Sequence, residues 1–140
     1  VEPSCRVIIA GLSAVALYAA TFSGILVSGP GTVVAISPRL AAYSRTPPRL
    51  NCAELQLASA GYYEPSLVFL TQTGIIMTDG AGAARHLLGS TCRMAFVDLR
   101  QEEAFKTSIS SQPGINLVGR VKGINLNGGK ALDIGVWLRQ

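Results

Sequence analysis

The segment from Gly61 to Leu70 places one carboxylate between aromatic and apolar residues. It reads Gly-Tyr-Tyr-Glu-Pro and then Ser-Leu-Val-Phe-Leu, so Glu64 stands beside Tyr62 and Tyr63 just before an apolar run. Only 14% of the residues are charged, against about 25% in typical domains, so a carboxylate here is unusual. It could position a metal ion or a basic side chain that binds a substrate donor. Alternatively, it accepts hydrogen bonds from the backbone or a tyrosine and only shapes the start of the strand.

The other residues that could do chemistry do not form a recognisable active site. His86 is the only histidine, and no serine–histidine–aspartate arrangement accompanies it. Asp98 and Glu102 could approach each other near the end of a strand, but carboxylates at the start of a helix ordinarily cap it. We therefore predict no catalytic residue and no metal ligand in this chain.

Two glycine-rich segments could bind phosphate, but a structural role explains each of them better. Residues 78–84 follow a possible strand, yet they lack the Lys-Ser/Thr pair of a phosphate-binding loop, and we interpret them as the start of a helix. Residues 123–129 are explained by a hairpin turn. The basic residues are scattered without interleaved aromatic residues, so the net charge of +4 does not indicate nucleic-acid binding.

The three cysteines do not have the spacing of a zinc site. We expect Cys5 to lie at a membrane edge without a partner. Two readings remain for Cys52 and Cys92. They are either two small buried thiols or a disulfide that ties the linker to the sheet, which requires an oxidising compartment.

An uncharged stretch near the N-terminus determines the expected location of the chain. No Asp, Glu, Lys or Arg occurs from Val7 to Pro38, and residues 7–27 would form a helix of ~31 Å, about one hydrocarbon thickness. A buried core helix of a soluble protein is the alternative, which so long an uncharged run disfavours. Small residues along this segment would permit close packing against other membrane helices. Because residue 1 is valine, we expect the chain to be the C-terminal piece of a multi-span membrane protein.

The whole chain predicts one N-terminal transmembrane helix followed by a small α/β domain. Residues 1–31 are the helix and its flanks, residues 32–52 an interfacial helix capped by Ser37 and a linker, and residues 53–140 the extramembrane domain. In the domain we expect strands at 66–72 and 93–99, helices at 79–89 and 100–110, and a C-terminal β-hairpin of 115–126 and 130–140. The order β-α-β-α-β-β predicts parallel first strands, helices packed on the sheet, and an antiparallel hairpin at one side.

Four segments of the chain resemble one class of membrane enzyme. Residues 61–73, 79–87, 92–105 and 119–138 are similar to the C-terminal extramembrane domain of bacterial polyprenyl-phosphate-sugar-dependent membrane glycosyltransferases. This is the superfamily of the aminoarabinose transferase of lipid A and the protein O-mannosyltransferases. The most specific parts are Glu-Pro-Ser-Leu-Val-Phe after Gly-Tyr and the Gly-x-Asn-x-x-x-Gly run of Gly123, Asn125 and Gly129.

The resemblance implies an accessory role in sugar transfer to an extracytoplasmic acceptor. In such enzymes a bundle of transmembrane helices takes the sugar from a polyprenyl-phosphate carrier, and the acidic catalytic residue lies far upstream of this domain. The chain alone is therefore expected to be non-catalytic and without a cofactor, while a divalent metal could serve the full enzyme. The implied partners are the lipid bilayer, the upstream helices of the same polypeptide and the lipid-linked sugar.

The resemblance also implies the bacterial inner membrane, with this domain in the periplasm. Arg39, Arg45 and Arg49 after the apolar stretch weakly favour the cytoplasm instead, but the topology of a whole bundle outweighs them. A periplasmic location favours the Cys52–Cys92 disulfide, and it would set Glu64, with Tyr62 and Tyr63, near the membrane-embedded substrate site. The competing hypothesis is a periplasmic binding or assembly module held by a single transmembrane helix.

Overall fold

The computed structural model describes residues 3–28, 36–45, 52–110, 112–125 and 127–140, with the side chains of the first helix described from 7 to 23. The helices are α1 (Pro3–Ser28), α2 (Ile36–Arg45), α3 (Pro65–Leu70), α4 (Gly80–Gly89) and α5 (Leu99–Ile109). The strands are β1 (Gln56–Ala60), β2 (Ile76–Thr78), β3 (Arg93–Asp98), β4 (Ile115–Ile124) and β5 (Ala131–Arg139). The predicted α/β class is confirmed.

The five strands form one mixed sheet in the order β2-β1-β3-β5-β4. Strand β1 pairs in parallel with β2 and β3, whereas β5 pairs antiparallel with both β3 and β4. The predicted antiparallel hairpin at one side is therefore confirmed. Parallel pairing also occurs, but it joins β3 to β1 and not to the predicted strand at 66–72. Strand β4 forms an edge of the sheet, and its pairing with β5 shifts register between Leu117 and Gly119.

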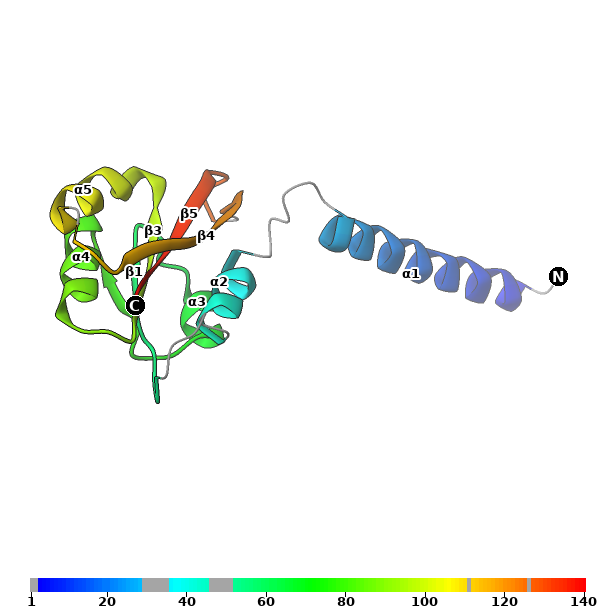
Figure 1. The fold of residues 1–140 in the computed structure, drawn as a ribbon. Helices are drawn as coiled ribbons and strands as arrows, with labels where there is room; N and C mark the ends of the chain where they lie inside the picture. The colour runs from blue at the N-terminus through cyan, green and yellow to red at the C-terminus, as the bar shows by residue number, and fades with distance from the viewer. Residues whose placement is uncertain (1–2, 29–35, 46–51, 111, 126) are drawn as a thin grey trace.

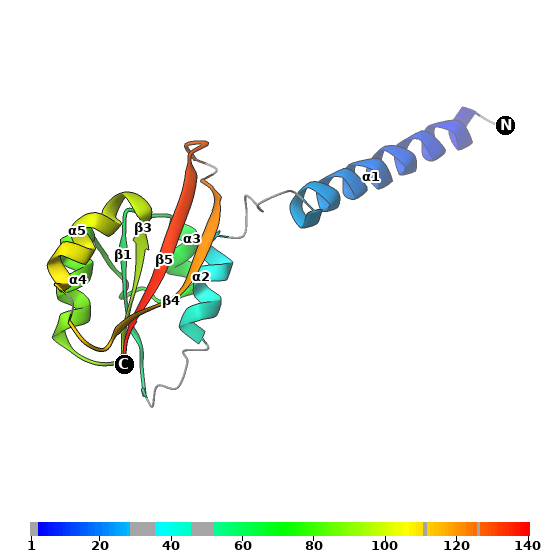
Figure 2. The ribbon, with the colours of Figure 1, turned by 45° about the horizontal axis from the view of Figure 1, so that its top comes forward.

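Two layers of helices cover the sheet, with α2 and α3 on one face and α4 and α5 on the other (Figures 1 and 2). Alternate residues of β3 serve the two layers, because successive side chains of a strand point to opposite faces. Met94 and Phe96 belong to the core cluster under α2 and α3, and Ala95 and Val97 to the cluster under α4 and α5. The strand thus separates two hydrophobic cores.

The predicted strand at 66–72 is wrong, because residues Pro65–Leu70 form the short helix α3. Proline at the first turn of a helix has its φ already set for helical geometry. Glu64 before it is extended, as expected of a residue that precedes proline. Within α3 only Leu67 is buried, so the alternating burial of a strand does not occur. The strands on this side of the sheet are β1 and β2, which were not predicted.

Helix α2 packs on the domain through the side that was expected to face a membrane interface. Its buried residues are Ile36, Ser37, Leu40 and Ala41. The helix begins at Ile36, so Ser37 is not its N-cap; the Ser37 hydroxyl instead contacts Tyr62 and Ser66. Residues 32–35 and most of the predicted linker lie outside the described residues.

Helix α1 lies apart from the sheet and its covering helices (Figures 1 and 2). Its described side chains are all exposed, and the large apolar ones among them are Val7, Ile8, Ile9, Leu12, Val15, Leu17, Tyr18 and Phe22. Among the described residues, no helix combines the length and the apolarity that crossing a bilayer requires. The transmembrane assignment of residues 7–27 stays a prediction.

Candidate functional site

A disulfide joins Cys52 to Cys92, whose Cα atoms lie 5.7 Å apart. Cys52 precedes β1 and Cys92 precedes β3, and the backbone N–H of Gln56 donates to the carbonyl of Cys92 at 3.0 Å. The bond therefore fixes the start of the domain to the middle strand of the sheet. Of the two readings of these cysteines, the structure has the disulfide. The side chain of Cys5 lies outside the described residues.

The neighbouring residues Tyr62, Tyr63 and Glu64 have three different partners. The Tyr62 hydroxyl is buried and lies 2.7 Å from the Oγ atom of Ser37. The Tyr63 hydroxyl donates to the carbonyl of Thr78 at 2.6 Å. Glu64 accepts a hydrogen bond at its Oε2 atom from Asn127, between β4 and β5. The three side chains therefore do not converge on one another, although they are consecutive.

The buried Tyr62 hydroxyl holds α2 and α3 together. Burial raises the pKa of Tyr62 above its ordinary value, although the hydrogen bonds from Ser37 and Ser66 oppose the shift. The Ser37 hydroxyl lies 2.8 Å from that of Ser66, so α2, Tyr62 and α3 share one hydroxyl cluster. A tyrosine with a raised pKa stays protonated at neutral pH, so its hydroxyl is a neutral hydrogen-bonding group between α2 and α3.

Glu64 is bonded to the turn between β4 and β5. Its Oε2 atom accepts a hydrogen bond of 2.7 Å from the Nδ2 atom of Asn127, which lies 63 positions later in the chain. Among the described residues, the other carboxylate oxygen of Glu64 has no hydrogen-bond partner. The carboxylate is only partly buried, so this second oxygen can accept a hydrogen bond or bind a cation from outside the domain.

The turn that holds Glu64 is shaped by the residues of the Gly-x-Asn-x-x-x-Gly run. The Oδ1 atom of Asn125 accepts from the backbone N–H of Asn127 at 2.9 Å, and its carbonyl accepts from that of Gly129 at 2.8 Å. Gly129 has a φ of +59°, a left-handed conformation that glycine adopts without a steric cost. The two most specific segments of the glycosyltransferase resemblance therefore meet at Glu64 and this turn.

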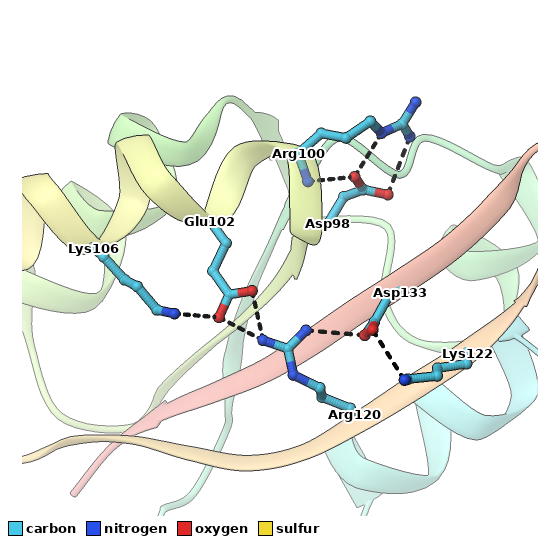
Figure 3. A network of polar contacts seen from close by, with 7 residues as sticks. All are labelled: Asp98, Arg100, Glu102, Lys106, Arg120, Lys122 and Asp133. Atoms are coloured by element: carbon cyan, nitrogen blue, oxygen red, sulfur yellow. Dashed lines mark hydrogen bonds and ion pairs between the residues drawn. The ribbon is translucent and has the colours of Figure 1, made fainter.

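A network of charged side chains connects α5 to the β4–β5 hairpin (Figure 3). Glu102 of α5 is only 3% exposed and receives the Arg120 guanidinium of β4 at 2.5 Å. Arg120 also donates to Asp133 of β5 at 2.9 Å, while Lys106 reaches Glu102 at 2.9 Å. Asp98 and Glu102 do not form a carboxylate pair, because Asp98 instead caps α5 and pairs with Arg100. This network was not predicted from the sequence.

The network keeps its carboxylates ionised. Burial by itself would raise the pKa of the Glu102 carboxyl, but the bonds from Arg120 and Lys106 bring the pKa below its ordinary value. Burial would likewise raise the pKa of the Asp133 carboxyl, but the hydrogen bond from Arg120 brings it below its ordinary value. A buried carboxylate that stays charged because it is paired with a partly buried guanidinium stabilises the fold and is a poor general acid or base.

We predict that the domain loses stability in acid through Glu102. A carboxyl with a lowered pKa in the folded state stabilises the fold above its unfolded pKa, about 4.3, and this stabilisation is lost as the pH falls through the folded pKa. The free energy of unfolding, measured in urea at a series of pH values below neutral, should fall with decreasing pH. This fall should be less steep in Glu102→Gln than in the native chain. The exposed neighbour Glu103→Gln is the control and should keep the slope of the native chain. The same dependence of the free energy of unfolding on pH in all three proteins would contradict the prediction.

A pocket of about 360 Å³ opens beside the network, between the start of α5 and the hairpin. It is lined by Asp98, Leu99, Arg100, Lys122, Gly123, Ala131, Leu132 and Asp133. Its four charged side chains already form ion pairs, Asp98 with Arg100 and Asp133 with Lys122. A charged ligand would have to displace these pairs, so the pocket is not a preformed charged-ligand site.

The histidine, cysteine and acidic side chains that the structure describes form no metal site. No group of three or more His, Cys, Asp or Glu side chains among the described residues could hold a metal ion. His86 is buried, its Nε2 atom lies 3.1 Å from the carbonyl of Gln56, and burial lowers its pKa. This histidine joins α4 to β1.

Comparison with known proteins adds no relative to this picture. No protein-family model, curated protein or solved structure matches the chain.

Proposed function

We propose that the chain is the periplasmic C-terminal domain of a membrane glycosyltransferase that uses a polyprenyl-phosphate-linked sugar, and that it is non-catalytic alone. The observation that carries the proposal is the 2.7 Å hydrogen bond between Glu64 and Asn127. It joins the Glu-Pro-Ser-Leu-Val-Phe segment to the turn built by Asn125 and Gly129. Two short segments with a common resemblance and a direct contact are better explained by one shared role than by coincidence.

The surroundings of the domain support this location. A disulfide such as Cys52–Cys92 persists in oxidising compartments, of which the bacterial periplasm is one. Helix α1 has no acidic residue and exposes a series of large apolar side chains. Exposed apolar surface costs free energy in water, about 25 cal/mol per Å², so a lipid bilayer with neighbouring helices is the environment that suits this helix.

Within the full enzyme, Glu64 would act at the boundary between this domain and the membrane-embedded site. Asn127 orients the carboxylate, and the second carboxylate oxygen remains available to a basic side chain or a divalent metal of the transmembrane part. Tyr62 and Tyr63 would support Glu64 by fixing the backbone on its N-terminal side through their bonds to Ser37 and Thr78. Glu64 is accordingly proposed as a positioning residue.

Glu64→Gln in the complete polypeptide tests the proposal. We expect transfer from a polyprenyl-phosphate-linked sugar, measured in membranes, to fall by about 10–100-fold, as for other orienting residues at a reaction site. Glutamine still accepts a bond from Asn127, so the protein should fold normally and only the charge is lost. The matched control is Glu103→Gln on α5, which should keep native activity.

Two outcomes would count against the proposal. Unchanged transfer by Glu64→Gln would leave Glu64 with a purely structural role. Membranes that contain the complete polypeptide but transfer no sugar from any polyprenyl-phosphate donor would refute the glycosyltransferase assignment itself. They would favour the alternative of an anchored binding or assembly module.

A further inference from the structure

Phe69 on α3 is the most exposed large apolar side chain among the described residues, at 90%. Its neighbour Leu67 is fully buried in the core, so α3 has an inner and an outer side. Arg45 of α2 lies next to this outer side, because its guanidinium donates to the carbonyl of Leu70 at 3.1 Å. An exposed aromatic ring and an exposed arginine thus belong to the same two-helix layer.

The charged side chains within α2 and α3 are two arginines, both on α2, while Glu64 precedes α3. The outer side of α2 exposes Arg39 and Arg45, and neither helix contains an acidic residue. The opposite layer differs, because α5 carries both glutamates and basic residues. Exposed aromatic and arginine side chains in one layer suit a membrane surface, where the ring enters the headgroup region and the arginines meet lipid phosphates.

The chain connection brings this same layer close to α1. Helix α2 begins at Ile36, eight positions after the end of α1 at Ser28. Eight residues span at most about 29 Å when fully extended. If α1 is held in a bilayer, α2 cannot be far from its surface, and α3 packs directly on α2 through the Ser37–Ser66 contact.

We propose that the outer side of α2 and α3 docks on the anionic surface of the membrane that holds α1. Phe69 inserts into the headgroup region. Arg39 and Arg45 bind lipid phosphates through the guanidinium N–H groups that the carbonyls of Lys122 and Leu70 leave unused. This docking rests on the proposed membrane location of α1, and it adds the face of the domain that is turned toward the lipid. This docking gives the domain a fixed orientation on the bilayer, which its connection to α1 alone would not provide.

The full chain reconstituted in vesicles tests the docking. Phe69→Trp and Leu99→Trp place a reporter on α3 and on the exposed start of α5, and the spectrum of the native chain corrects for the buried Trp137. In phosphatidylglycerol vesicles with brominated acyl chains, we expect blue-shifted and strongly quenched emission from Phe69→Trp but not from Leu99→Trp. Adding Arg39→Gln and Arg45→Gln to Phe69→Trp, or using phosphatidylcholine vesicles, should reduce the quenching.

The possible failures can be distinguished. A chain that does not float with the vesicles would remove the membrane location of α1 and the docking with it. A chain that floats with the vesicles but shows equal quenching at both positions would overturn the docking and leave the membrane location intact. A blue shift at Phe69→Trp without lipid quenching would mean that protein, such as a second copy, covers this face, which also overturns the docking.

Discussion

Replacing Arg120 by methionine is expected to lower the free energy of unfolding by about 2–4 kcal/mol. The substitution removes the guanidinium that bonds both oxygens of Glu102, a carboxylate that is 3% exposed. Glu102 keeps only Lys106, and Asp133 keeps only the longer contact with Lys122. A buried carboxylate that has lost its main partner retains most of its desolvation cost. Urea unfolding at neutral pH, followed by circular dichroism, measures the loss.

Lys122→Met is the matched control for this loss. Lys122 belongs to the same network, but its side chain is 74% exposed and lies 3.4 Å from Asp133. Exposed ion pairs contribute about 0–1 kcal/mol, so the control should change stability little. The double variant Glu102→Leu with Arg120→Met should be more stable than Arg120→Met alone, since it leaves no buried charge. A loss in Arg120→Met no larger than that in Lys122→Met would contradict the expectation.

Breaking the Cys52–Cys92 disulfide is expected to cost about 2–4 kcal/mol. The bond closes a loop between residues 40 positions apart. Closing a loop of this size lowers the entropy of the unfolded chain, which corresponds to a free energy of about 4 kcal/mol at 25 °C. Cys92→Ser should therefore unfold at lower temperature and lower urea concentration than the native chain. The loss should fall on the whole domain, because β1 and β3 are the strands tied together.

A reductant provides the control for the disulfide. Dithiothreitol should lower the unfolding midpoint of the native chain to that of Cys92→Ser and leave Cys92→Ser itself unchanged. Cys5→Ser should behave like the native chain with and without reductant. If Cys92→Ser and the native chain unfolded at the same urea concentration under oxidising conditions, the disulfide would have no role in stability.

The elements with distinct local signals were predictable from the sequence. Asp79 caps α4 by accepting a bond from the backbone of Gly82 at 2.7 Å, and Asp98 caps α5 in the same way through Arg100. The Asn-Gly-Gly turn similarly indicated the hairpin of β4 and β5. Strand β1 lacked such a signal, because Gln-Leu-Ala-Ser-Ala has one large apolar residue and its alanines are buried only by the close packing of α4.

The contacts of the candidate site were less predictable than its residues. Glu64 was conspicuous because of its apolar surroundings, but nothing local indicates a bond to Asn127, which depends on the final position of the hairpin. Glu102 offered a signal that was missed. With Phe105 and Ile109 it forms the buried side of α5, and a carboxylate on the apolar side of a helix requires a cationic partner from another element.

The edge strand β4 is contacted by residues of helix α2. The guanidinium of Arg39 donates to the carbonyl of Lys122 at 3.4 Å, and the Tyr43 ring lies against Gly119, where the register of the strand shifts. A long outermost strand is otherwise a template on which identical chains stack into aggregates. Helix α2 thus contacts the edge strand β4, and detaching the helix would expose a surface prone to self-association.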